Sequence, residues 1–271
     1  MNGLKNYSIL KTKTLFLVVF AFVLNAQAKQ EPDIYRVGLS AGWVNYLEPG
    51  YVSFYGVMFG VDGLIQLNYS SQFDLRIEGD LLYGNIQYDG SVKDTVTGAV
   101  SPLKAGSYDY VLVGRIKPEF QIASAGAADF FLNFGLGGRY LNDRVNSTSG
   151  YQREISYVFL PIGLRTEIRT GQNIFGVDLE YDFFVLGKVK SHLSDTNPTN
   201  PDVTNTQSSG YGIRAQTEWR ILTGSGSFGI KPYFQWWNVG ASDAAPYTSG
   251  LVLVEPQNSS SLTGIIFDMD F

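Results

Sequence analysis

The chain has 271 residues, of which 44% are hydrophobic, 14% aromatic and 17% charged, and its formal net charge is −5. A negative chain lacks the basic face that a nucleic-acid partner requires, so no nucleic acid is expected. The absence of cysteine excludes a disulfide framework and a lipid anchor on cysteine, so stability must come from the fold itself.

The segment 1–28 predicts a cleaved signal peptide. Three lysines form a basic start, and residues 15–24 form an apolar run. That run is too short to be a membrane-spanning helix, which needs about 20 apolar residues. Ala26 and Ala28 supply the small residues of a cleavage site. We therefore expect export of the chain, with residues 29–271 forming one domain.

Alternation with a period of two residues dominates the remaining sequence. In 73–83, apolar residues such as Leu75 and Ile77 alternate with charged residues such as Asp74 and Arg76. A helix would scatter these charges around its circumference, so the pattern indicates strands. About ten strands are expected, near 34–46, 54–69, 73–88, 108–122, 129–142, 154–169, 174–190, 211–222, 227–239 and 260–271.

The expected links between these strands alternate in length. Short links follow the second, fourth, sixth and eighth strands, whereas the others are mostly longer, with 47–53 the shortest of that group. Bacterial outer-membrane barrels combine short periplasmic turns with long outer loops. The sequence therefore predicts an all-β fold, a single transmembrane antiparallel up-and-down β-barrel of about 10 strands, with 8 or 12 as alternatives. An even number of strands places both termini in the periplasm.

The last residues carry a family resemblance. Gly264, Phe267 and Met269 match the C-terminal signal read by the barrel-assembly machinery, and Phe271 extends that pattern by two residues. Over 29–271 the chain resembles the small bacterial outer-membrane β-barrel proteins. The resemblance implies integration in the outer membrane, with outer-membrane lipid and lipopolysaccharide around the barrel. It also implies passage with periplasmic chaperones and insertion by the barrel-assembly machinery, and we expect a monomer.

The polar face of the expected strands is balanced in charge. On the expected register it carries cations and carboxylates in equal number, with Lys188 and Lys190 among the cations. This balance suits a confined lumen, because burying an unpaired charge is costly. We expect a lumen charge network formed by Arg76, Glu78, Asp80, Arg115, Lys117, Glu119, Arg165, Glu167, Asp178, Glu180, Asp182, Arg214, Glu218, Asp268 and Asp270.

A barrel of about ten strands leaves little space for a channel. Open porins use about 16 strands. Here the charge network would fill much of the lumen, together with the inward bulk of Phe131, Tyr157, Phe159, Phe184, Tyr233 and Trp237. We expect a non-enzymatic integral outer-membrane protein with a structural or narrow-channel role and surface-exposed loops. No cofactor or metal is expected, because one histidine and no cysteine leave only carboxylates as ligands, without the dense spacing of a calcium loop.

Two hydrolytic alternatives rest on the single histidine. His192 and Ser194 form a His-x-Ser pair similar to that of the lipid A deacylases, in which the imidazole activates the serine. That family has an asparagine after the serine and a glutamate about a dozen residues on, whereas here Asp195 follows and no glutamate lies between Ser194 and Glu218.

The second hydrolytic alternative is an enzyme similar to the omptin surface proteases, which also have ten strands. Those proteases use paired aspartates and an Asp–His couple at the outer rim. The corresponding residues would be Asp89 with Asp94 and His192 with Asp195, without the family's close spacing. A third alternative is a surface adhesin or recognition protein that makes contact through its outer loops.

Overall fold

The computed structural model describes residues 32–93, 99–248 and 251–271. The predicted signal peptide, with its cleavage residues Ala26 and Ala28, lies outside these residues. Within them, no helix is long and apolar enough to cross a membrane.

The fold of the described residues is all-β, as predicted, but these residues form fourteen strands and not about ten. The strands are β1 (Ile34–Glu48), β2 (Val52–Ser70), β3 (Phe73–Lys93), β4 (Val100–Ala125), β5 (Ala128–Phe134), β6 (Leu136–Arg144), β7 (Gln152–Thr170), β8 (Asn173–Ser191), β9 (Val203–Gln207), β10 (Gly210–Thr223), β11 (Gly226–Val239), β12 (Ala245–Thr248), β13 (Leu251–Leu253) and β14 (Asn258–Asp270).

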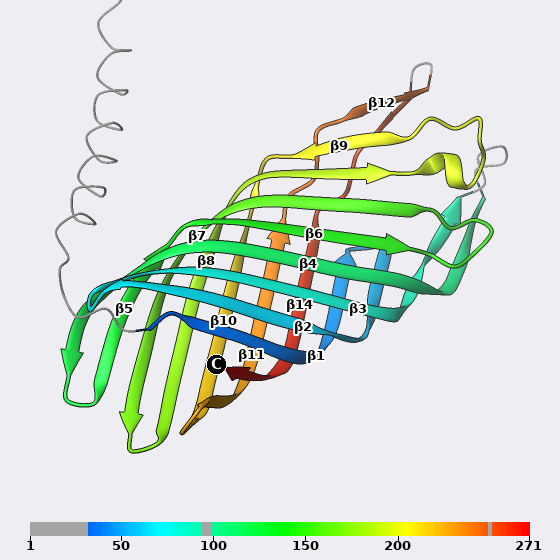
Figure 1. Ribbon diagram of the computed structural model, residues 1–271. Helices are drawn as coiled ribbons and strands as arrows, with labels where there is room; N and C mark the ends of the chain where they lie inside the picture. Colours follow the sequence, from blue (N-terminus) through cyan, green and yellow to red (C-terminus); the bar gives the residue numbers. More distant parts are fainter. Residues whose placement is uncertain (1–31, 94–98, 249–250) are drawn as a thin grey trace, which may run out of the picture.

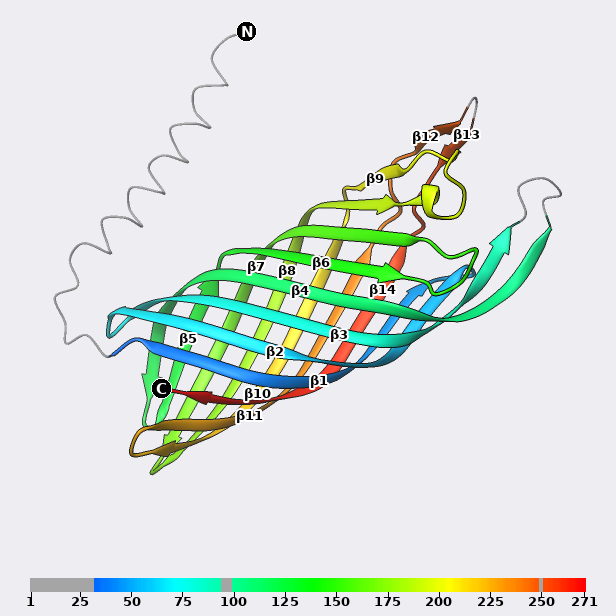
Figure 2. The same ribbon diagram turned by 45° about the vertical axis from the view of Figure 1, so that its right-hand side comes forward.

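All strand pairs are antiparallel, and the pairing follows the chain around one ring (Figures 1 and 2). β1 pairs with both β2 and β14, β14 continues to β11, and β10, β8 and β7 follow. β7 then pairs with β5 and β6, both of which pair with β4. The ring is completed through β3 and β2, so the first and last strands lie side by side.

The predicted strand 129–142 is divided into β5 and β6 at Gly135. This residue lies where two neighbouring strands carry Pro118 and Pro161, and proline has no N–H to donate to the ladder. The Gly135 N–H donates to the Pro161 carbonyl, and a side chain at this position would collide with the Ile116 carbonyl. The interruption is therefore a consequence of two missing donors and one close backbone approach.

The other additional strands come from segments that the sequence places in loops. β9 and β10 both pair with β8, one after the other, and they are separated only by Ser208 and Ser209. β12 and β13 form a separate two-stranded hairpin within the last long connection. The count of about ten was wrong because it omitted these short strands and the division at Gly135.

The two ends of the ring differ in their connections. The turns that end β2, β4, β7 and β10 are short, and at the same end Arg36 of β1 pairs with Asp270 of β14. We call this end the turn rim. At the opposite end, the loop rim, lie the longer connections, including the 3-10 turn Leu193–Asp195 and the β12–β13 hairpin.

The outward face of the strands is apolar and bordered by two bands of aromatic rings. Near the turn rim, a chain of ring contacts runs from Tyr69 to Phe73, then to Phe120 and then to Phe134. Nearer the loop rim, a second set of aromatic rings lies in contact in pairs. The pairs are Trp43 with Tyr55, Tyr110 with Tyr140, Tyr181 with Tyr211, and Tyr211 with Trp236. We call these bands the inner and outer girdles. On β4, ten residues separate Tyr110 of the outer girdle from Phe120 of the inner one, which is the length with which a tilted strand crosses a bilayer.

A bulge in β8 changes which side chains face inward. Phe184 pairs with Phe159 and Leu186 with Val158, so Val185 has no partner on β7. Beyond this extra residue the alternation is inverted. Lys188 therefore faces outward and is exposed, and the Lys190 side chain is 44% exposed. The expectation that both lysines belong to the lumen was wrong.

Candidate functional site: the barrel lumen and its outer mouth

The lumen has two sections of different chemistry. Along β3 the inward residues near the turn rim are Asp74, Arg76, Glu78 and Asp80, whereas those nearer the loop rim, from Leu82 onward, are mostly apolar. The same change occurs along β7, β11 and β1. We call the two parts the charged section and the apolar section.

Glu180 of β8 is the centre of the charged section. Its two carboxylate oxygens accept hydrogen bonds from Arg115 Nε and Lys117 Nζ, both at 2.8 Å. Lys117 also lies 3.2 Å from Glu78, to which Arg214 of β10 reaches at 3.2 Å. Because Arg115, Lys117 and Glu180 are almost completely buried, their charges are compensated within the protein and not by solvent.

Towards the turn rim, the network continues through β4, β5 and β7. Arg165 donates two hydrogen bonds to Glu119 Oε1, at 3.0 Å from Nε and 2.6 Å from Nη2, and its Nη1 donates to Glu167 at 2.8 Å. The Arg165 guanidinium also lies over the Phe131 ring, 4.0 Å from its centroid. Arg76 lies 3.6 Å from Glu119 and 3.1 Å from Glu78, which joins this group to the centre.

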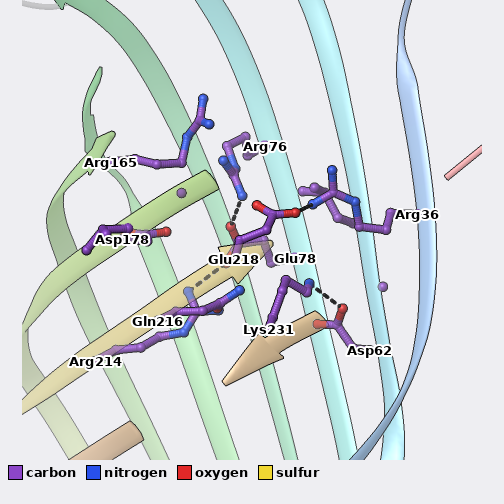
Figure 3. Close-up of a pocket in the computed structure, with 14 residues that line it drawn as sticks. Arg36, Asp62, Arg76, Glu78, Arg165, Asp178, Arg214, Gln216, Glu218 and Lys231 are labelled. Carbon is purple, nitrogen blue, oxygen red and sulfur yellow. Dashed lines mark hydrogen bonds and ion pairs between the residues drawn. The ribbon is translucent and has the colours of Figure 1, made fainter. Parts of the chain in front are cut away.

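On the β1–β14–β11–β10 side, Asp268 joins two cations. Arg220 approaches it at 2.6 Å and Lys231 at 2.8 Å, and Lys231 also donates to Asp62 at 2.9 Å. Arg220 further contacts Glu218 and Asp270, the acids that Arg36 approaches from β1. Strands distant in sequence are thus joined across the lumen (Figure 3).

Two cavities remain between the side chains of the charged section and at the turn rim. A vestibule of about 440 Å³ at the turn rim is lined by turn residues such as Ser71 and extends inward to Arg76 and Arg220. Deeper in the charged section, the cavity between Asp178, Arg214 and Lys231 measures only about 30 Å³ (Figure 3). That is about the volume of one water molecule. The charged section therefore leaves little free space in this part of the lumen.

The apolar section forms a core inside the barrel. Trp237 packs against Phe159 and Tyr157, with ring centroids 5.0 and 5.8 Å apart. Phe159 and Met58 are completely buried. Arg115 marks the boundary between the sections, because its guanidinium lies 5.4 Å from the Phe159 ring centroid. The sequence predicted the inward bulk of Tyr157, Phe159, Tyr233 and Trp237, but not that together they form a continuous section.

A cluster around Arg153 covers the apolar section at the loop rim, and we call it the mouth cluster. Arg153 pairs with Glu48, Asp143 at 3.2 Å and Glu255 at 3.2 Å. Its guanidinium also lies over the Tyr46 and Phe54 rings. Sequence reasoning missed this cluster because the expected strands ended before Glu48 and began after Arg153. The continued alternation from Tyr46 to Glu48 was the available signal.

Carboxylates outnumber cations in this part of the mouth, which lies beyond the outer girdle. Burial, opposed by Arg153 and reinforced by Glu48 and Asp143, raises the pKa of the Glu255 carboxyl to about 7. Burial also raises the pKa of Asp143, against the effect of Arg153. Asp109 is buried nearby, where desolvation and the Asp143 charge raise its pKa to about 8. The mouth cluster therefore retains protons at pH values at which exposed carboxylates are charged.

His192 does not activate Ser194. The imidazole Nε2 lies 2.8 Å from Glu154 and Nδ1 lies 3.1 Å from Asp202. The Ser194 hydroxyl donates to Asp202 Oδ1 at 2.7 Å. Both ring nitrogens thus face carboxylates, and the serine hydroxyl donates its proton towards the Asp202 carboxylate and not towards the imidazole. Glu154 and Asp202 were not predicted as partners of His192.

The residues expected for an omptin-like site are also engaged elsewhere. Asp195 accepts a hydrogen bond from the Gln152 N–H at 3.0 Å, and Asp89 pairs with Lys104 at 2.7 Å. Asp94 lies outside the described residues. In the described part of the chain, no group of three or more histidine and acidic side chains is arranged to hold a metal ion.

The predicted assembly signal lies on β14. Phe267, Met269 and Phe271 face outward and are exposed, whereas Asp268 and Asp270 enter the lumen network. Gly264 lies against the Tyr233 side chain, where a larger residue would collide with it. The alternation of apolar and acidic residues therefore corresponds to the two faces of the strand.

No protein-family model matches the sequence, and no curated protein matches it. The solved structure of the outer membrane protease OmpT from Escherichia coli is similar, with a TM-score of 0.59. The similarity covers 92% of this chain and 100% of OmpT at 10% identity. The toluene transporter TodX from Pseudomonas putida has a TM-score of 0.36 at 10% identity, covering 92% of this chain and 93% of TodX. Neisserial surface protein A has a TM-score of 0.30 at 8% identity, covering 88% and 98%. Together with the antiparallel ring, the similarity to OmpT shows that this chain has the fold of the bacterial outer-membrane β-barrel proteins.

Proposed function

We propose that this chain is an integral protein of the bacterial outer membrane whose barrel is closed, with a structural and non-enzymatic role. The observation that carries the proposal is the filled lumen. Its charged section leaves a cavity of about 30 Å³, and its apolar section is a packed core with Phe159 and Met58 completely buried. A solute would have to displace both sections, which favours the structural role over a narrow channel.

The location rests on the outward face of the strands. Exposed apolar residues lie between two aromatic girdles, an arrangement that a lipid environment satisfies and water does not. In this orientation the turn rim and both termini are periplasmic and the loop rim faces outward. Outer-membrane lipid and lipopolysaccharide surround the barrel, and the outward residues of β14 serve the barrel-assembly machinery.

The geometry at His192 supports the non-enzymatic part of the proposal. Hydrolysis through Ser194 would require the hydroxyl to donate to the imidazole, but it donates to Asp202. The likeness to OmpT at 10% identity concerns the fold. His192 is paired with Glu154 and Asp202, and Asp89 is paired with Lys104, so neither lies in the couple expected for a protease.

Planar-bilayer recording of the refolded chain tests the closed barrel. We expect no discrete conductance steps at any applied voltage, because the charge pairs and the apolar core block the path in series. The heat-dependent shift in gel mobility that marks a folded barrel should be measured on the same sample. This control excludes misfolded protein as the reason for a missing current. Reproducible steps from the folded chain would overturn the structural role in favour of a channel.

A further inference from the structure

His192 joins the outer connection between β8 and β9 to the body of the barrel. It follows β8 directly, and its own N–H donates to the Gln152 carbonyl at the start of β7. Its side chain lies between Glu154 of β7 at 2.8 Å and Asp202, the last residue before β9, at 3.1 Å. One ring therefore connects the two ends of segment 192–202 to a neighbouring strand.

The protonation of this ring follows from its two partners. A carboxylate only accepts hydrogen bonds, so each ring nitrogen must carry a proton to bond with one. Neutral imidazole has a single N–H, whereas imidazolium has two. A hydrogen bond from His192 lowers the pKa of Glu154, and hydrogen bonds from Ser194 lower that of Asp202. Both acids are therefore charged under ordinary conditions. With Nε2 hydrogen-bonded to Glu154, a neutral ring would turn the Nδ1 lone pair towards the Asp202 carboxylate at 3.1 Å, so this geometry favours imidazolium.

The remaining groups around the ring do not change this requirement. Lys190 of β8 lies 4.0 Å from Asp202 and shares that carboxylate, while the Tyr140 hydroxyl of β6 faces Glu154. Asp195 of the 3-10 turn is turned towards the Gln152 N–H. Thus the two carboxylates are the groups that contact the ring nitrogens.

We propose that His192 is a proton-dependent clamp, which holds segment 192–202 against β7 when the imidazole is protonated and releases it when the proton is lost. On deprotonation one ring nitrogen presents a lone pair to a carboxylate, so an attractive contact becomes repulsive. The stabilisation by the clamp is therefore present at acid pH and is lost as the pH rises. Histidine is the side chain that ordinarily changes charge between pH 5 and 8. The outer surface of the barrel therefore responds to acidification.

The composition of the chain gives this proposal a direct test. The chain has no cysteine and one histidine. Thr199→Cys at the exposed tip of the segment thus provides a single site for a nitroxide label on the full-length, refolded protein. We expect the electron paramagnetic resonance spectrum to show a restrained label near pH 5.5 and a mobile one near pH 8.5. Losing one part-exposed ion pair corresponds to a change of up to about fivefold in the opening equilibrium.

Two further variants separate the clamp from a general effect of pH. Adding His192→Gln should leave the label mobile at both pH values, and adding Glu154→Gln should weaken the restraint at acid pH. A matched label at Ser101→Cys, exposed on the β3–β4 hairpin away from the clamp, should show no such change. Gel mobility verifies that each variant is folded. A Thr199→Cys spectrum that does not change with pH, or an equal change in the folded His192→Gln variant, would refute the clamp.

Discussion

At the residue scale, Arg153 is the central cation of the mouth cluster. Three carboxylates contact it, and two aromatic rings lie against its guanidinium. Arg153 partly compensates the acids, while Asp109 adds a further buried carboxylate nearby. Because Glu255 belongs to the last long connection, its pairing with Arg153 also fixes that connection over the mouth.

This cluster predicts a dependence of stability on pH. Burial raises the pKa of Glu255 to about 7 from its ordinary value, so the folded state binds more protons than the unfolded state in the interval between them. The free energy of unfolding should therefore fall as the pH rises from about 4.5 to about 7. We expect Glu255→Gln, which is uncharged throughout, to flatten this dependence. Urea unfolding midpoints of the refolded protein across this range measure the effect.

Asp89→Asn provides the matched control for that experiment. Asp89 pairs with Lys104, whose side chain is 69% exposed, so its contribution is small and its loss should leave the pH slope unchanged. A slope in the Glu255→Gln variant equal to that of the original chain would show that Glu255 does not hold the additional proton.

At the scale of elements, glycines of the barrel wall occupy two very different environments. Gly137 of β6 faces the lumen, where an added methyl group would collide with the ring of the completely buried Phe159. Gly79 of β3 faces outward, and no heavy atom lies within 4 Å of the place its side chain would occupy. The apolar section therefore depends on the absence of a side chain at Gly137 and not at Gly79.

The two glycines form a matched pair of variants. We expect Gly137→Ala to destabilise the barrel by about 1–3 kcal/mol, because the packed ring cannot move without displacing its neighbours. Gly79→Ala should leave stability almost unchanged. Urea unfolding of both variants measures the difference. Equal midpoints would mean that the apolar section can rearrange around the added methyl group.

Much of the wall could be predicted from sequence, because the alternation of apolar and charged residues reflects the two faces of each strand directly. Interruptions of that alternation could not be predicted from the sequence. The extra residue Val185 inverts the facing of Lys188 and Lys190, and a single residue of this kind carries no distinctive sequence signal. The division at Gly135 depends on two prolines, Pro118 and Pro161, that meet it only through strand register.

The residues of the lumen could also be predicted only in part from the sequence. The members of the charged section could be collected from their shared face, but their partners depend on contacts across the lumen, such as Lys231 with Asp62. The partners of His192 were missed for the same reason. Glu154 reaches it from β7, and Asp202 reaches it across its own loop. Such pairings require the register of the strands, which pattern alone does not provide.

At the scale of the whole molecule, the proposed barrel is closed twice in series. The charged section depends on ion pairs such as Lys117 with Glu180, and the apolar section on rings such as Phe159 and Trp237. Two closures in series resist an ion current independently, so removing one leaves the other in place.

This arrangement predicts how the barrel can be opened. Phe159→Ala with Trp237→Ala should leave the barrel silent in planar bilayers, and so should Lys117→Ala with Glu180→Ala, which removes both members of an ion pair. Combining the four substitutions should produce brief conductance steps. Gel mobility checks that each variant is folded. Steps from either pair alone would show that one section is the sole barrier.

The unequal length of the strands has a consequence for the reach of the molecule. β3 and β4 continue for about ten residues beyond Tyr83 and Tyr110, and their hairpin projects past the neighbouring strands (Figure 2). At about 3.3 Å per residue, this extension measures roughly 30 Å along the strand. In the proposed orientation the hairpin stands clear of the lipid head groups, as a stiff antiparallel ribbon. An antibody or a phage fibre would therefore meet this ribbon well before it approached the bilayer.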